Sequence, residues 1–319
     1  MTIKTPLTDM LGVEHPIMLA GMGGVSYAEV VAAVSNAGGF GTLGMAGTSA
    51  RFIEGQMQRV RELTDKPFGV DLLSAQPESL TSAIDVIIAN GAKAFVAGLG
   101  VPYPIVKQLK DNGVLVIAVI GKVDHAIKAE QAGCDAVIAQ GTEGGGHTGS
   151  VASVALWPQV VDAVKIPVVA AGGLYDGRGL AAALALGCVG VWMGTRFIAS
   201  TEAHAGAAYK EAIVGMSEAD TVVSRGFTGK TLRAIRNRTT ERFEKEPAKP
   251  FPLQAMESAQ ENRLGPIAGV TENLDPETQC FAAGQGGGGV HAILPCAEIV
   301  QRTLAEAETT LARIGRLAA

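Results

Sequence analysis

The stretch DAVIAQGTEGGGHTGSV, residues 135–151, joins an apolar run typical of a buried strand to a loop rich in glycine. The glycines surround a single histidine, His147. Glycine allows the main chain to approach a bound group closely, and imidazole can exchange protons near neutral pH. Taken alone, the stretch is equally compatible with a glycine-rich turn that carries a surface histidine. Its interpretation therefore depends on where it falls in the chain.

The same unit recurs on both sides of this stretch, as a helical run, a glycine and a short apolar strand. The predicted strands are residues 16–22, 40–45, 68–73, 94–100, 115–120, 136–141, 167–173 and 190–195. The predicted helices between them are residues 27–36, 49–63, 78–90, 103–112, 123–132, 152–164 and 177–186. Alternating strands and helices predict a parallel sheet, and eight units predict a closed (β/α)8 TIM barrel. A doubly wound open sheet is the alternative, but it seldom has eight evenly spaced units.

Glycines punctuate the predicted helix ends. Those expected to adopt a left-handed C-cap conformation are Gly38, Gly91, Gly113, Gly133 and Gly187.

The regular alternation of predicted strands and helices ends after residue 195. Residues 204–214 and 232–246 have helical, charged sequences, and proline-rich and polar spans follow at 247–254 and 271–279. We expect a barrel of residues 1–214 completed by residues 281–319, with a small, mostly helical substrate or lid domain at 215–280. A helix over about 296–314 is expected to return to the barrel.

Composition limits the classes of function. Apolar residues make up 47% of the chain, charged residues 18% and aromatic residues 5%, which is typical of a core of small aliphatic side chains around parallel strands. A net charge of −5 gives no reason to expect a nucleic acid or membrane partner. The four cysteines are far apart and form no metal-binding pattern, and the first residues lack the apolar core of a signal peptide. We expect a cytoplasmic protein without a metal.

A barrel of this kind works at the carboxyl ends of its strands, and phosphate characteristically binds after strands seven and eight. Those loops contain Gly172 and Gly173, and then Gly194 and Thr195. Exposed main-chain N–H groups and a hydroxyl suit a phosphate. Ordinary glycine turns are the alternative, yet both loops fall where a phosphate site is expected.

Other candidate residues follow other strands on the same face. His147 comes after strand six, Gly21 and Met22 after strand one, and Asp71 at the end of strand three. A phosphate site with a histidine one loop away indicates a flavin mononucleotide (FMN) across the barrel mouth. The remaining histidines are expected to be structural or on the surface: His15, His125, His204 and His291.

Several motifs extend this interpretation: PIMLAGM, SNAGGFGTLG, LTDKPFGVDLL, EGGGHTG, AAGGLYDGRGLAAALALG, WMGTRF, TGKTLRAIRN and AGQGGGG. In their order and spacing, they resemble the nitronate monooxygenase (2-nitropropane dioxygenase) family of FMN-dependent barrels, which includes flavin enoyl-ACP reductases. The resemblance implies a proton-transfer role for His147. The cofactor-binding residues that it implies are Ala20, Gly21, Met22, Asp71, Gln140, Gly145, Gly172, Gly173, Gly194, Thr195 and Gln285.

The chain departs from the family pattern at three places. Asp71 stands where the family often has asparagine, so the amide donor is lost or the carboxyl is protonated or paired. Leu19 and Ala20 replace a polar residue and a glycine. Val119 stands where some nitronate oxidisers carry a lysine, with Lys122 three residues later.

These observations predict an FMN-dependent oxidation of alkyl nitronates by O2. The alternative is an NAD(P)H-dependent flavin reductase or dehydrogenase acting on an enoyl-ACP, an acyl-CoA or a quinone. The basic run from Lys230 to Arg238 would bind a phosphate in that case, or else form a solvated helix face. A third possibility is a non-catalytic barrel that binds a phosphate ligand. The expected assembly is a monomer or homodimer.

Overall fold

The computed structural model describes residues 3–74 and 77–317. Its main sheet consists of eight parallel strands: β1 (Ile17–Leu19), β2 (Gly41–Gly44), β3 (Phe68–Leu73), β4 (Ala94–Gly98), β5 (Leu115–Ile120), β6 (Ala136–Gln140), β8 (Val168–Ala171) and β9 (Val191–Met193). They follow the order β1-β9-β8-β6-β5-β4-β3-β2, and a bridge between Met18 and Phe40 joins the two ends. The predicted TIM barrel is confirmed.

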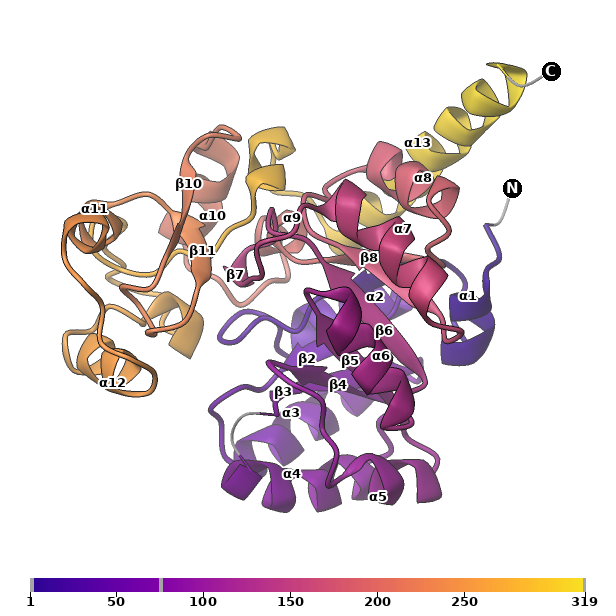
Figure 1. Cartoon of the computed structure of the whole chain (residues 1–319), viewed down its shortest axis with the longest axis horizontal. Helices are drawn as coiled ribbons and strands as arrows, with labels where there is room; N and C mark the ends of the chain where they lie inside the picture. The colour runs from indigo at the N-terminus through magenta and orange to yellow at the C-terminus, as the bar shows by residue number, and fades with distance from the viewer. Residues whose placement is uncertain (1–2, 75–76, 318–319) are drawn as a thin grey trace.

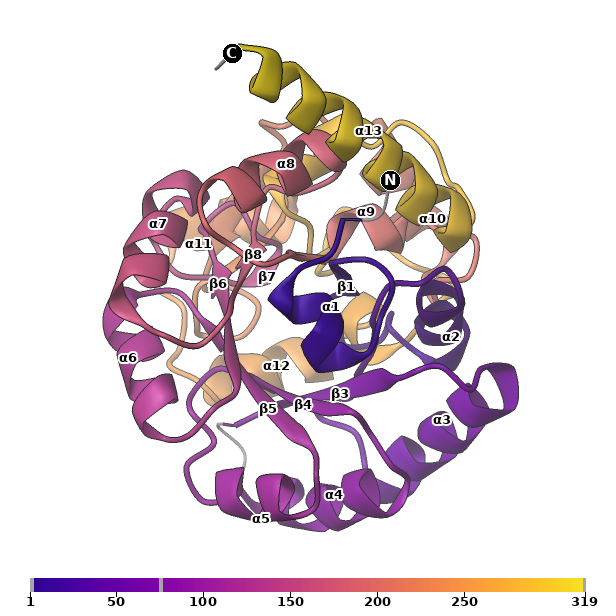
Figure 2. The ribbon, with the colours of Figure 1, turned by 90° about the vertical axis from the view of Figure 1, so that its right-hand side faces the viewer.

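Helices surround this barrel as a ring (Figure 2). They are α2 (Ala28–Asn36), α3 (Ala50–Leu63), α4 (Pro77–Ala89), α5 (Val106–Asp111), α6 (Val123–Gln131), α7 (Ser153–Ala163) and α8 (Gly177–Ala185). In α3, the buried residues Ile53, Met57 and Val60 recur at helical spacing, and the Ser49 side chain accepts the Phe52 N–H. The glycines expected to cap helices all have φ between 66° and 89°, as the sequence predicted.

One further helix, α1 (Pro6–Leu11), lies at the centre of the ring in Figure 2 and was not predicted. Its Leu7 and Leu11 are fully buried in the same cluster as Met18, Phe40 and other side chains of the barrel interior. The amino end of the barrel is thereby filled with apolar side chains.

The region after the barrel contains more strand than we expected. Its elements are α9 (Thr195–Ile198), α10 (Ala207–Gly215), β10 (Thr221–Ser224), β11 (Leu232–Ile235), α11 (Arg238–Lys245), α12 (Leu253–Gln260), η1 (Pro266–Ala268) and η2 (Gln285–Gly289). The helix predicted over 232–246 is wrong in its first part. Residues 232–235 pair with β10 and with β7 (Gly146–His147), and Asn237 begins the helix only afterwards by accepting the Thr240 N–H.

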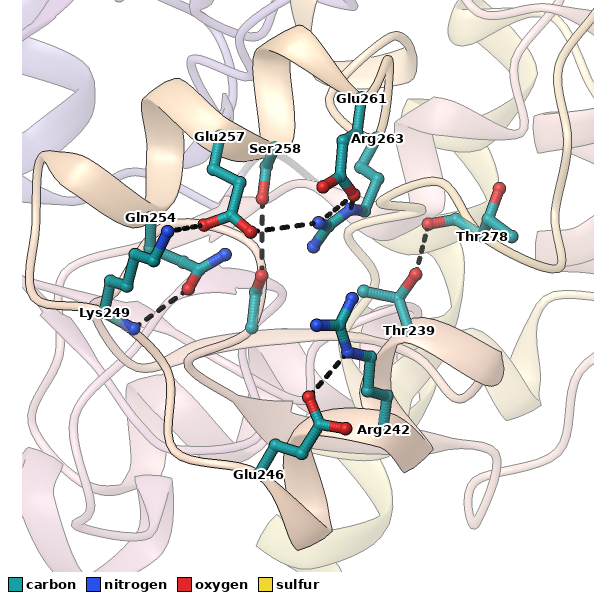
Figure 3. Close-up of polar contacts among 11 residues, drawn as sticks. Thr239, Arg242, Glu246, Lys249, Gln254, Glu257, Ser258, Glu261, Arg263 and Thr278 are labelled. Carbon is teal, nitrogen blue, oxygen red and sulfur yellow. Dashed lines mark hydrogen bonds and ion pairs between the residues drawn. The ribbon is translucent and has the colours of Figure 1, made fainter.

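A polar network joins the helices of this region (Figure 3). The Arg263 side chain, 6% exposed, pairs with Glu261 and lies 3.9 Å from Glu257, whose other oxygen is 2.7 Å from Lys249 Nζ. Ser258 donates to the carbonyl of Gly226, in the turn between β10 and β11. In Figure 1 the hairpin and α11–α12 lie to one side of the barrel. We propose that residues 215–280 form a separate small unit on this basis.

The last helix, α13 (Cys296–Leu317), packs against α8 (Figure 2). Glu306 accepts the Gly177 N–H at 3.0 Å, and a Cβ at Gly177 would lie 2.2 Å from the Thr303 carbonyl. The expected return of the C-terminal helix to the barrel is therefore observed.

Candidate active site

A cavity of about 980 Å³ lies at the carboxyl ends of the barrel strands. Every strand of the barrel contributes a terminal or loop residue to its wall. The turn between β10 and β11 and the segment around residue 284 complete the wall from the other side. The barrel and the region after it thus share one cavity.

The residues expected from the sequence gather here, with one exception. The cavity wall includes Ala20, Gly21, Met22, Asp71, Gln140, Gly145, His147, Gly172, Gly173, Gly194 and Thr195. Gln285 lies instead on a second cleft beside Tyr175 and Arg302, although its neighbours Gly284 and Gly286 reach the main cavity. The Gln285 side chain is therefore not part of the site that we propose.

The loops after β8 and β9 form a cradle of main-chain N–H groups. Within the described chain, the N–H groups of Gly172, Gly173 and Gly194 donate to no protein acceptor. Gly173 has φ +71°, and a Cβ placed there would have no protein atom nearer than 3.5 Å, so it would occupy cavity space. Free N–H groups beside an open space fit a phosphate group.

The segment that closes the cavity is fastened to this cradle. Thr195 Oγ1 accepts the Gly284 N–H at 2.9 Å. On the other side, a Cβ at Gly145 would lie 2.7 Å from the Ala283 carbonyl carbon. Gly145 is thus required for this packing, independently of any ligand.

The opposite wall brings the loop after β1 against β2 and β3. A Cβ at Gly44 would lie 2.4 Å from main-chain atoms of Met22, and one at Gly21 would lie 2.3 Å from Asp71 Cβ. At both places only glycine leaves room for the neighbouring segment, so no side chain of Gly21 or Gly44 projects into the cavity.

Asp71 presents its carboxyl group on this wall. Its side chain has no hydrogen bond or ion pair within the described chain. Burial raises the pKa of the Asp71 carboxyl well above its usual range. The sequence left open a lost donor, a protonated carboxyl or a paired carboxyl, and pairing with a cation is excluded among the described residues.

His147 lies in β7, which is added to the hairpin as a third strand through pairing with Leu232. Its Nε2 is 3.0 Å from Thr228 Oγ1, and its Nδ1 forms no hydrogen bond within the described chain. Burial lowers the pKa of His147 to about 4, and Lys230 adds to this effect. The imidazole is consequently neutral at pH 7. From the sequence we had expected it to exchange protons near neutral pH.

Three neighbouring side chains hold the His147 loop in place. Gln140 Nε2 donates to the His147 carbonyl at 2.9 Å. Glu143 accepts the main-chain and hydroxyl protons of Ser153, at the start of α7. Arg233, almost fully buried, donates to the Thr142 carbonyl and to Thr221 Oγ1, both at 2.9 Å.

The basic run predicted at residues 230–238 divides among several structural roles. Arg233 is buried as described, whereas Arg236 pairs with Glu244 and Arg238 with Glu277. Lys230 alone lines the cavity, with its ammonium over the Phe251 ring. The run is therefore neither a helix face nor a continuous phosphate site.

Exposed cationic side chains surround the cavity mouth. Lys122 is the N-cap residue of α6 and Lys128 lies in its last turn, with His125 between them in the sequence, and Arg225 comes from the hairpin turn. Lys128 pairs with Asp124, whereas Lys122 and Arg225 have no ion-pair partner within the described chain. We call Lys122, Lys128, Arg225 and Lys230 the cationic rim.

The sequence reasoning did not identify Thr228 as a site residue. Its signal was the TGKT stretch, which we had assigned to the second domain without a role in the site. Only the pairing of β7 with β11 brings this residue against His147.

Comparison with known proteins decides the family. The sequence model described as nitronate monooxygenase matches residues 4–83 and 79–306. The chain belongs to the nitronate monooxygenase family. Its members are flavin-dependent oxidoreductases, and the chain is accordingly an oxidoreductase.

Individual relatives of this family member carry different names. A "(3aS,4S,5R,7aS)-5-hydroxy-7a-methyl-1-oxo-octahydro-1H-indene-4-carboxyl-CoA dehydrogenase" of Rhodococcus jostii is 44% identical over 73% of this chain, and the match spans 66% of that protein, slightly less than two thirds. A "Probable nitronate monooxygenase" of Staphylococcus aureus is 38% identical over 75% of this chain and 80% of its own. The structure of FabK from Thermotoga maritima superposes with a TM-score of 0.91 and 37% identity, covering 99% of this chain and 100% of that one.

Two further properties concern metals and membranes. No group of three or more potential metal ligands is present among residues 3–74 and 77–317. Within the same residues, no helix has the length and apolar character needed to cross a membrane.

Proposed function

We propose that this protein is an FMN-dependent oxidoreductase whose substrate is an acyl thioester, with a nicotinamide nucleotide as its redox partner. The observation that carries this proposal is the distribution of charge in the cavity. Its interior holds His147, whose imidazole is neutral at pH 7, and Asp71, whose carboxyl has a pKa raised by burial, while Lys122, Lys128 and Arg225 lie at the exposed rim. A neutral reacting group with an anionic tail matches this arrangement.

An acyl thioester has these two parts. Its carbonyl and adjacent carbons are uncharged, whereas the carrier to which it is attached, coenzyme A or phosphopantetheine, carries phosphate. A phosphate outside the cavity mouth would meet the cationic rim, in which Lys122 and Arg225 have no ion-pair partner among residues 3–74 and 77–317. The name of the Rhodococcus relative, which ends in carboxyl-CoA dehydrogenase, agrees with this chemistry.

The residues of the cavity fit FMN. The free N–H groups of Gly172, Gly173 and Gly194 would hold its phosphate, and the wall from Gly21 to Asp71 would lie against its ring. FMN, when bound, supplies transfer of two electrons together with a hydrogen. This function rests on a cradle that a single Cβ at Gly173 would occupy.

His147 would handle the proton of the substrate. If its Nε2–H donates to Thr228, the lone pair of Nδ1 is free for a proton. In the oxidising direction, this nitrogen would accept the proton next to the thioester carbonyl. The low pKa keeps the imidazole unprotonated over the whole neutral range.

Oxidation of nitronates is the second candidate, since the family model covers most of the chain. A nitronate is an anion, and among the described residues the cation beside His147 on the cavity wall is Lys230, whose ammonium lies over the Phe251 ring. The lysine that some nitronate oxidisers carry is Val119 here, and it lies on the cavity wall. We therefore rank this candidate below the thioester.

Anaerobic stopped-flow spectroscopy of the flavin-loaded protein separates the candidates. We would mix the oxidised protein separately with NADH, NADPH and ethyl nitronate. Protein whose flavin has been reduced would then be mixed with a short enoyl-CoA. Bleaching of the flavin by a nicotinamide nucleotide, followed by reoxidation with the enoyl-CoA, is the expected result. Rapid bleaching by ethyl nitronate alone, with no response to either nucleotide, would replace our proposal with the second candidate.

A further inference from the structure

Asp71 is the ionisable group that the proposed proton transfer leaves unused. It lies near the end of β3, in register with Gly44 on β2 and Val96 on β4. The hypothetical Cβ of Gly21 would lie 2.6 Å from its Oδ2, and that of Gly98 would lie 3.5 Å from its Oδ1. Glycines on both sides thus bring main chain up to the carboxyl group and leave no side chain to cover it.

None of the elements packed against Asp71 offers it a charge. The loop after β1 contributes Gly21, β2 contributes Gly44, and β4 contributes Val96 and Gly98. Elsewhere on the cavity wall, the titratable groups are His147, Tyr209, and the exposed side chains Tyr103, His125 and the cationic rim. None of these bonds to Asp71 within the described chain.

A buried carboxylate without a cation or N–H donors is unfavourable, and such a group takes up a proton instead. A carboxylic acid has nearly the same shape as a carboxamide, with one acceptor oxygen and an O–H donor in place of the N–H. The neutral acid therefore supplies the kind of donor that the family's asparagine would supply at this position.

We propose that Asp71 is held as a neutral carboxylic acid whose O–H group donates a hydrogen bond to the ligand of this cavity. Under the proposed function that ligand is FMN, so the part of this inference that concerns FMN rests on the proposed function. The protonation of Asp71 does not, because its half-buried position and its lack of a bonding partner among the described residues belong to the protein itself.

Ionisation of Asp71 then sets the alkaline limit of cofactor binding. Loss of the proton removes the donor and places a negative charge on the cavity wall. If the ionised form binds FMN negligibly, the affinity falls about tenfold per pH unit above the pKa of Asp71. Below that pKa, the affinity does not depend on this group.

The test is a titration of apoprotein with FMN, followed by quenching of flavin fluorescence from about pH 6 to about pH 10. The wild type should lose affinity at alkaline pH. Asp71→Asn should match it near pH 6 and keep its affinity at high pH, since the amide donates but cannot ionise. Asp71→Leu should bind more weakly at every pH. Asp162→Asn, an exposed carboxyl on α7, is the matched control and should behave as the wild type.

Infrared difference spectra of the FMN-free protein give a second readout. The carbonyl stretch of a protonated carboxylic acid should be present at neutral pH in the wild type and absent in Asp71→Asn. Absence of this band from the wild type, or equal alkaline losses of affinity in wild type and Asp71→Asn, would overturn the proposal. If FMN does not bind at all, the FMN assignment fails, and the infrared band alone decides the state of Asp71.

Discussion

Two side chains in the cavity, His147 and Asp71, carry ionisable groups that are largely removed from bulk water. Burial lowers the pKa of the imidazole to about 4 and raises that of the carboxyl. At neutral pH the histidine is therefore a proton acceptor, whereas burial shifts the Asp71 carboxyl toward its protonated, donating form. Opposite shifts within one cavity are a common way in which enzymes separate an acid from a base.

The shift at His147 predicts a loss of stability in acid. The unfolded chain binds a proton as the pH falls through about 6.5, whereas the folded chain binds it only near 4. The free energy of unfolding should fall across this window by up to about 3 kcal/mol. His147→Gln should remove this contribution. Urea denaturation at neutral pH and near pH 4 measures it, and an unchanged acid loss in the variant would assign the effect to other groups.

Gly173→Ala tests the phosphate cradle. The new Cβ would enter the cavity, where no protein atom lies within 3.5 Å, so we expect a folded protein that has lost at least about tenfold in FMN affinity. Gly113→Ala is the control, because Gly113 has φ +75° and open space around it. Both variants bear the same backbone strain, roughly 1–2 kcal/mol. Equal FMN affinities in the two variants would argue against this cradle.

Most of the single residues on the cavity wall could be predicted, because a position after a parallel strand fixes which end of the barrel a residue occupies. Gly172, Gly173, Gly194 and Thr195 followed from this rule alone. The side chain of Gln285 was misplaced, since the rule gives no orientation outside the repeat. The protonation of Asp71 depends on neighbours from three other strands, which one sequence does not reveal.

At the level of elements, the hairpin β10–β11 positions the histidine loop. The buried Arg233 side chain of β11 donates hydrogen bonds to the Thr142 carbonyl in the histidine loop and to Thr221 Oγ1 on β10. Arg233→Met keeps the volume and removes the donors, which should cost about 3 kcal/mol for two charged hydrogen bonds. Hydrogen exchange should increase at residues 142–148. The control Arg236→Met breaks only an exposed pair with Glu244 and should change neither quantity appreciably.

The barrel strands were predictable and the hairpin was not, for a physical reason. Each barrel strand is a short apolar run bounded by glycine or proline, so its pattern is local. The segment LRAI in β11 is a strand because β10 and β7 pair with it, and its charged sequence continues directly into α11. Helix α1 was missed because its apolar face, with Leu7 and Leu11, fills the barrel rather than covering it.

For the whole molecule, α13 is the element that joins the last part of the chain to the barrel. Its buried residues end at Ala307, and residues 312–317 are exposed. A chain ending at residue 295 should aggregate or remain unfolded, because it uncovers the apolar side of α8. A chain ending at residue 311 should stay folded. Gel filtration and circular dichroism distinguish the two, and a folded, soluble shorter chain would show that α13 is dispensable.

Strand β7, which joins the hairpin β10–β11 as a third strand, has a consequence for the order of folding. His147 belongs to a loop between β6 and α7, yet Thr228, which contacts its ring, is 81 residues later in the chain. During synthesis, six barrel strands and the histidine leave the ribosome well before the hairpin that fixes them. Contacts of such sequence separation form late, because the loop-closure entropy must be overcome first. His147 and Thr228 consequently meet only after the hairpin has been made, so the proposed proton-transfer site is completed later than the strands that precede it.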